Sequence, residues 1–176
     1  MTARMIARGA AYAALYVALT MVPGLHALAY RDVQFRVAEC LLVFVFFDRA
    51  ALPGIVVGTA IANGFGPMAV VDVWFGALLT LVAGLAMQRA GAHVIALAIP
   101  VLVNGLGVPV ELHLLLDLPF WASVAWVSLG EAVVMFGLGL PLLLLVRAGA
   151  FAPVLGDQGR RGSRECAGGA QGGTTA

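Results

Sequence analysis

The chain has 176 residues, of which 62% are apolar and 11% charged, and its formal net charge is +1. With a mean hydropathy of +1.01, nearly every long segment prefers hydrocarbon to water, which predicts an all-α integral membrane protein. The small net charge gives no reason to expect nucleic acid as a partner.

All ten basic residues are arginine, and the chain contains no lysine. A phosphate-binding P-loop needs its lysine and Schiff-base catalysis needs an amine, so these two classes of enzyme are excluded. Cys40 and Cys166 match no metal-ligand spacing and do not suggest a disulfide. We therefore expect a protein that is not an enzyme and has neither cofactor nor metal site.

The first expected span, residues 8–28, begins beside Arg4 and Arg8 and ends near Ala-Leu-Ala at 27–29. A basic start, a short apolar run and an A-x-A end are also typical of a cleaved signal peptide, which stays open as an alternative. Three alanines at spacing four favour retention, because they form a smooth helical face that another helix can approach closely. They are Ala10, Ala14 and Ala18.

The second and third expected spans, 34–47 and 52–65, form a hairpin of short apolar runs. Arg36 and Glu39 are three residues apart at the start of the first run, and Asn63 returns to their level at the end of the second. An ionised glutamate at bilayer depth costs at least about 2.5 to 3.5 kcal/mol, so these groups need partners or a polar cavity. They are expected either to line a small-solute pocket or to form a structural cluster that fixes helix packing.

Asp72 and Trp74 lie near the start of the fourth expected span, 70–87. Asp72 is a candidate solute ligand, although a carboxylate at a helix N-terminus can also act simply as a cap. The fifth expected span, 94–112, contains Asn104 followed by Gly-x-Gly. Its amide either contacts the solute or satisfies backbone groups loosened by the nearby glycine and proline.

Glu111 and His113 end the fifth span. The sixth, 125–146, carries Trp126 near its start and Glu131 in its interior. A glutamate deep in a helix must pair within the bundle, face the solute or stay neutral.

Residues 148–176 change abruptly to glycine, alanine and arginine, which predicts a disordered tail. Six spans with both termini in the cytoplasm put most arginines on the cytoplasmic side, in agreement with the positive-inside rule. On that side lie Arg4, Arg8, Arg49, Arg89, Arg147 and the tail arginines, against Arg31 and Arg36 outside.

Seven short motifs follow one another between about residues 10 and 147. They are QFRVAE at 34–39, FFD at 46–48, LPG at 52–54, IANGFG at 61–66, VDVWFG at 71–76, ELH at 111–113 and LPFW at 118–121. In order and spacing they resemble the QueT family, the substrate-binding S components of energy-coupling factor (ECF) transporters assigned to uptake of queuosine precursors.

The resemblance implies a six-helix S component in a prokaryotic plasma membrane. Such a subunit binds its solute from outside and docks on a membrane T subunit driven by two ABC ATPase subunits, which agrees with the missing P-loop lysine. The stripe of Ala10, Ala14 and Ala18 is similar to the small-residue motif by which S components meet the T subunit. The tail has no counterpart in the family pattern.

A queuosine precursor of this type, 7-cyano- or 7-aminomethyl-deazaguanine or queuine, keeps the guanine edge with two N–H donors beside a carbonyl acceptor. A carboxylate can accept both donors, an amide can serve either side, and an aromatic ring can stack on the flat face. The candidates for these roles are Glu39, Asp72, Glu111 and Glu131; Asn63 and Asn104; and Trp74, Trp121 and Trp126. Arg36 and His113 complete the expected substrate-binding set.

Three other functions stay open. The chain could be an S component for another vitamin-like solute, because the same side chains suit other polar heterocycles. It could also be a proton-coupled secondary transporter with Glu111 and Glu131 as a proton relay. A structural membrane subunit without a solute is the third.

Overall fold

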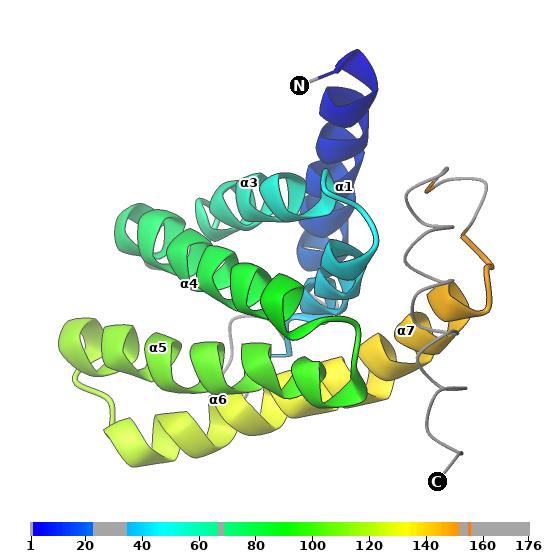
Figure 1. Cartoon of the computed structure of the whole chain (residues 1–176). Coiled ribbons are helices and arrows are strands. Elements are labelled where there is room, and N and C mark those ends of the chain that lie inside the picture. Colours follow the sequence, from blue (N-terminus) through cyan, green and yellow to red (C-terminus); the bar gives the residue numbers. More distant parts are fainter. Residues whose placement is uncertain (1, 23–34, 67–68, 152–154, 156–176) are drawn as a thin grey trace, which may run out of the picture.

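The computed structural model describes residues 2–22, 35–66, 69–151 and 155, and within these ranges every regular element is a helix (Figure 1). The elements are α1 (Ala3–Met21), η1 (Val37–Phe46), α3 (Ala51–Asn63), α4 (Ala69–Ala90), η2 (Val94–Leu97), α5 (Ala98–Leu116), α6 (Phe120–Val134), η3 (Met135–Gly139) and α7 (Leu140–Arg147). Positions 23–28 of the first expected span, the start of the second, and nearly all of the expected tail lie outside the described residues.

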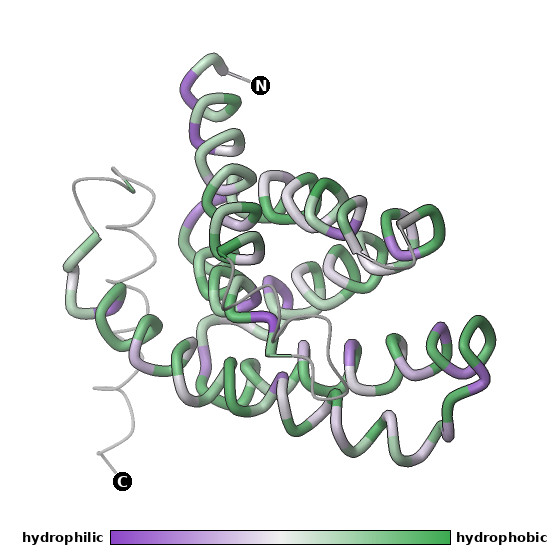
Figure 2. The backbone as a smooth tube through the Cα atoms, turned by 180° about the vertical axis from the view of Figure 1, so that it is seen from behind, coloured by the Kyte–Doolittle hydropathy of each residue, from purple (hydrophilic) through white to green (hydrophobic). Residues whose placement is uncertain are grey.

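Three described helices are long and apolar enough to cross a membrane: Val70–Ala90, Val94–Leu116 and Phe120–Arg147. About 20 helical residues span a hydrocarbon core of roughly 30 Å, and each of these helices reaches that length. Figure 2 shows mainly the colours of hydrophobic residues along these three helices. The described residues are thus all-helical, with three helices of membrane-spanning length and composition, in agreement with an integral membrane protein, whereas a bundle of six spans stays a prediction.

The centre of the bundle is η1, a ten-residue 3₁₀ helix rather than an α-helix. It contacts α1, α3, α4, α6, η3 and α7, and its residues from Ala38 to Val45 are all buried. A helix that is apolar all round belongs in such an interior position. A 3₁₀ helix rises about 2.0 Å per residue instead of about 1.5 Å, so this short run reaches farther across the bundle than an α-helix of equal length.

Helix α3 packs closely on α1 through two glycines four residues apart, Gly54 and Gly58. A Cβ on Gly58 would lie 2.8 Å from Cβ of Tyr16 and 2.9 Å from the carbonyl oxygen of Ala13. This is the small-residue spacing that lets membrane helices approach each other. On the opposite side of α1, Ala10, Ala14 and Ala18 are exposed, and none of the described elements covers them.

The last long helix is continuous from α6 to α7 but contains one π-helical turn, η3 (Figure 1). Pro141 follows this turn and has no N–H for the carbonyl group four residues earlier. A π-turn is a common way for a helix to accommodate such a break. The expected span 125–146 therefore lies within one irregular helix.

Candidate functional site

Polar and charged side chains from six elements are buried together in an otherwise apolar bundle. Each of these residues exposes 9% of its surface or less. We call them the buried polar cluster: Tyr16, Arg36, Glu39, Asn63, Asp72, Asn104, Glu111 and Glu131. All except Tyr16 belong to the substrate-binding set expected from the sequence.

Arg36, which caps the N-terminus of η1, is the shared electrostatic partner of this cluster. Its guanidinium interacts with the carboxylates of Glu39, Asp72, Glu111 and Glu131. One guanidinium among several carboxylates is an unusual arrangement, because desolvated charges are tolerated only with good partners.

Arg36 and Asn63 both hold the carboxylate of Asp72. The Arg36 Nη2 atom lies 3.5 Å from Asp72 Oδ2. Asn63 Nδ2 donates to the backbone carbonyl of Asp72 at 2.9 Å and to Asp72 Oδ1 at 3.2 Å. A Cβ on Gly76 would lie 2.9 Å from Asp72 Oδ1, so this glycine leaves room for the contact. Asp72 is in the first turn of α4, yet its side chain links three elements rather than only capping its own helix.

Tyr16 joins α1 to the cluster. Its hydroxyl group donates to Glu39 Oε1 at 2.6 Å, while Glu39 Oε2 is buried and has no hydrogen-bond partner among the described residues. Sequence reasoning missed this tyrosine. The available signal was its position with Ala13 and Thr20, at spacings of three and four residues, on the side of α1 that is buried.

Asn104 and Glu111 lie seven residues apart on α5, two turns along one helical face. Asn104 Nδ2 donates to Glu131 Oε1 at 3.3 Å and so links α5 to α6. The amide nitrogen of Asn104 thus contacts a carboxylate, and contact of this side chain with a solute stays a prediction. Both carboxylate oxygens of Glu111 are buried and accept no hydrogen bond from the part of the chain that the structure describes, although Asp72 and Arg36 are within electrostatic range.

The tryptophans lie apart from this cluster. Trp74 is 78% exposed and Trp121 76% exposed, while Trp126 is also exposed. His113 is exposed as well, and its Nδ1 lies 2.8 Å from the carbonyl oxygen of Leu118. Exposed tryptophans near helix ends, such as Trp121 at the start of α6, are typical of a membrane interface. The structure therefore brings together the charged and amide candidates but not the aromatic ones.

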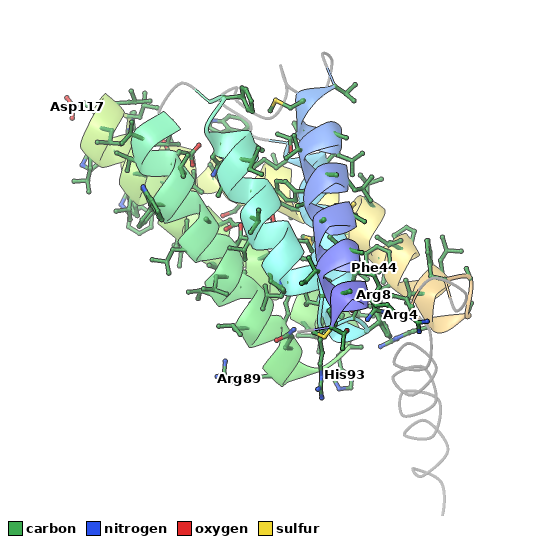
Figure 3. The ribbon with its side chains drawn as sticks, turned by 90° about the horizontal axis from the view of Figure 1, so that it is seen from above. Arg4, Arg8, Phe44, Arg89, His93 and Asp117 are labelled. Atoms are coloured by element: carbon green, nitrogen blue, oxygen red, sulfur yellow. The ribbon has the colours of Figure 1, made fainter. Side chains whose placement is uncertain are left out.

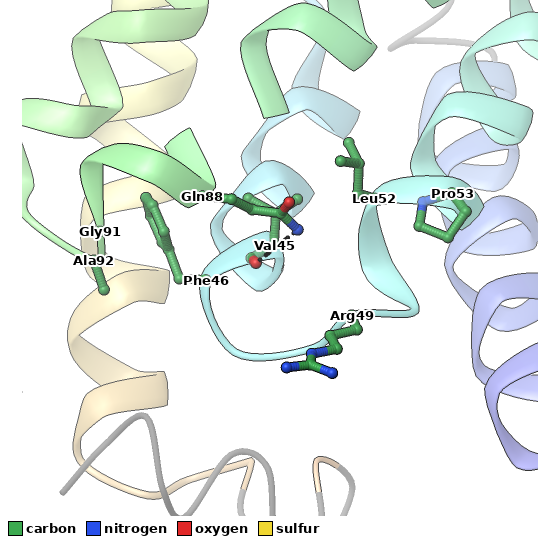
Figure 4. A pocket seen from close by; sticks show the side chains of 8 residues that line it. All are labelled: Val45, Phe46, Arg49, Leu52, Pro53, Gln88, Gly91 and Ala92. Atoms are coloured by element: carbon green, nitrogen blue, oxygen red, sulfur yellow. Dashed lines mark hydrogen bonds between the residues drawn. The ribbon is translucent and has the colours of Figure 1, made fainter. Parts of the chain in front are cut away.

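A separate cavity of about 440 Å³ lies beside the other end of η1 (Figure 4). Its lining is Val45, Phe46, Arg49, Leu52, Pro53, Gln88, Gly91 and Ala92. Gln88 Nε2 donates to the carbonyl oxygen of Val45 at 3.3 Å across it. None of these residues belongs to the expected substrate-binding set.

The described carboxylates do not form a group that could hold a metal ion. Within the described ranges, no three histidine, cysteine, aspartate or glutamate side chains converge closely enough to hold one. The open oxygens of Glu39 and Glu111 come from different elements, so a ligand with separated hydrogen-bond donors matches them better.

Comparison with known proteins gives two matches. A family model described as the QueT transporter matches residues 6–148. The Queuosine precursor transporter QueT of Lactococcus lactis subsp. cremoris (strain MG1363) is 47% identical over 70 residues, which is 40% of this chain and 41% of that relative. The chain thus aligns with less than half the length of this relative. No solved structure matches the chain.

Proposed function

Because the chain belongs to the QueT transporter family, we propose that it is the substrate-binding S subunit of an ATP-driven ECF importer for a queuosine precursor. The single observation that carries this proposal is the set of unpaired carboxylate oxygens in the buried polar cluster. A membrane protein that buries carboxylate oxygens without a hydrogen-bond donor among its described residues is typically one that offers them to a solute.

The chemistry of a deazaguanine suits this cluster. The guanine edge offers two neighbouring N–H donors, and a carboxylate with both oxygens open can accept both. Glu111 has this property, because neither of its oxygens has a hydrogen-bond partner. Glu39 offers one open oxygen, and Asn104 lies two turns from Glu111 on the same helix.

The proposed orientation has both termini in the cytoplasm. Its support is the gathering of Arg4, Arg8 and Arg89 at one end of the helices, with Asp117 at the other end (Figure 3). Basic residues accumulate on the cytoplasmic side of membrane proteins. The buried polar cluster lies toward the opposite end from these arginines, because η1 runs from Arg36 at the cluster to Phe44 near them. A solute arriving from outside would reach this end first.

The proposed docking face for the membrane T subunit is the uncovered side of α1. Ala10, Ala14 and Ala18 are all exposed there, while the other side of the helix packs on α3 and η1. Small residues in a row let a partner helix approach closely. Two ABC ATPase subunits, bound through the T subunit, supply the energy.

The test is thermal stabilisation of the detergent-purified full chain by a panel of deazapurines and vitamins. A ligand that binds the folded state raises the melting temperature, so deazaguanines should stabilise the protein and unrelated vitamins should not. Stabilisation by a different vitamin alone would assign the chain another solute. A protein that no member of the panel stabilises would contradict the proposal and favour a structural subunit.

A proton-coupled secondary transporter is the second candidate, and the observation that favours it is the burial of two carboxylates, Glu111 and Glu131, on facing helices. Such residues can relay protons across a membrane. Uptake that persists without ATPase subunits and collapses with the proton gradient would establish this mechanism in place of the first.

A further inference from the structure

The buried polar cluster has more negative than positive groups. Within the described part of the chain its carboxylates are Glu39, Asp72, Glu111 and Glu131, and its cation is Arg36. An uncompensated carboxylate in a membrane interior is strongly disfavoured, so the cluster calls for additional positive charge or for protons.

The carboxylates differ in how far they are already satisfied. Asp72 is held by Arg36 and Asn63, and one oxygen of Glu131 accepts a hydrogen bond from Asn104. Glu39 and Glu111 are 1% and 4% exposed, yet one oxygen of the first and both oxygens of the second have no hydrogen-bond partner. The open acceptors therefore fall at two places, one on η1 and one on α5.

Building on the proposed function, we infer that Glu111 and Glu39 bind two different parts of the solute. Glu111 accepts hydrogen bonds from the paired N–H donors of the heterocycle. Glu39 accepts a hydrogen bond from a protonated amine on a substituent of the ring. The cluster thereby selects a cationic deazaguanine over a neutral one. Glu111 suits the paired donors because both of its oxygens are open. Glu39 suits an ammonium group because one oxygen is open and the other is fixed by Tyr16.

Two alternatives fit the arrangement less well. A metal ion needs several ligands converging on one point, and the described carboxylates do not converge in that way. A neutral heterocycle could satisfy Glu111, but it would bring no positive charge to Glu39. A hydrogen bond from a charged donor to a carboxylate is roughly twice as strong as a neutral one.

The experiment compares two ligands that differ in charge at one substituent, 7-aminomethyl-7-deazaguanine and 7-cyano-7-deazaguanine, binding to the full chain in detergent. The aminomethyl compound is cationic near neutral pH and the cyano compound is neutral. The wild-type protein should bind the cationic ligand roughly tenfold tighter or better, which is the factor that one charge-assisted hydrogen bond supplies.

Two matched variants separate the roles, because each replaces one of the two open carboxylates with an amide of the same shape. Glu39→Gln should abolish the preference for the cationic ligand by weakening its binding, whereas Glu111→Gln should weaken the binding of both ligands alike and leave the preference intact. The comparison of the two ligands on the wild-type protein tests the inference even if a variant does not fold.

The outcomes test the preference for a cationic ligand separately from the proposed function as a queuosine-precursor importer. Equal binding of both ligands, or tighter binding of the cyano compound, would overturn the inference and leave the transport proposal standing, as would a preference that survives in Glu39→Gln. Failure of the folded wild-type protein to bind either ligand would refute the proposed substrate and the inference together.

Discussion

Replacing Gly58 with alanine should destabilise the protein, although alanine is the better helix former. Glycine in a helix interior is about 1 kcal/mol less favourable than alanine, so on propensity alone the change would stabilise α3. The new Cβ, however, would lie 2.8 Å from Cβ of Tyr16 and 2.9 Å from the carbonyl oxygen of Ala13. Both atoms belong to α1, one of them to its rigid backbone, so the helix itself must move.

The magnitude follows from two losses. Overpacking a close interface costs typically about 1 to 3 kcal/mol. Moving α1 also lengthens the 2.6 Å hydrogen bond from Tyr16 to Glu39, and a hydrogen bond to a charged group contributes about 1.5 to 3 kcal/mol. After the propensity gain of about 1 kcal/mol is subtracted, a net loss of about 1.5 to 5 kcal/mol remains. For a protein of this size each 1 kcal/mol lowers the melting temperature by about 2 to 4 °C.

The assay is the apparent melting temperature of the ligand-free protein in detergent at one fixed scan rate, which keeps irreversible unfolding comparable between variants. Gly137→Ala is the matched control, because a Cβ at Gly137 meets no atom within 4 Å. That variant should be neutral or slightly stabilised. If Gly58→Ala and Gly137→Ala melt at the same temperature, the close packing of α3 on α1 does not limit stability and the reasoning fails.

Three further predictions concern other parts of the chain. Ala14→Leu should lower transport while solute binding survives, since a bulky side chain on the exposed face of α1 holds off a partner helix; loss of binding, or unchanged transport, would show that this face is not the coupling surface. The mass of the mature protein should include the first helix, because its packing role would be lost on cleavage, and a mass matching a start at Tyr30 would contradict this. Asn63→Ala should lower the melting temperature by leaving the buried carboxylate of Asp72 short of donors, at a cost of about 1 to 3 kcal/mol. A melting temperature equal to that of the wild type would show that water replaces the amide.

The amino-acid sequence by itself determined the class of this protein and every member of its buried polar cluster except Tyr16. An apolar content of 62% leaves hydrocarbon as the solvent for most segments. In that solvent a charged or amide side chain must be sheltered, so Glu39, Asp72, Glu111 and Glu131 could be singled out by their positions inside apolar runs. Their burial follows from the same physics, because their partners are available only inside the bundle.

The tertiary structure alone decided which of these groups meet. Spacing along the chain made Arg36 and Glu39 neighbours. The partners that hold Asp72, however, come from η1 and α3, and the hydroxyl group that donates to Glu39 belongs to Tyr16 on α1. Such contacts depend on how separate helices cross, and helix crossing is set by close packing at small residues rather than by any local pattern. The 3₁₀ form of η1 has the same origin, since contacts on all its sides, rather than its own propensity, hold ten residues in a geometry that is uncommon in isolation.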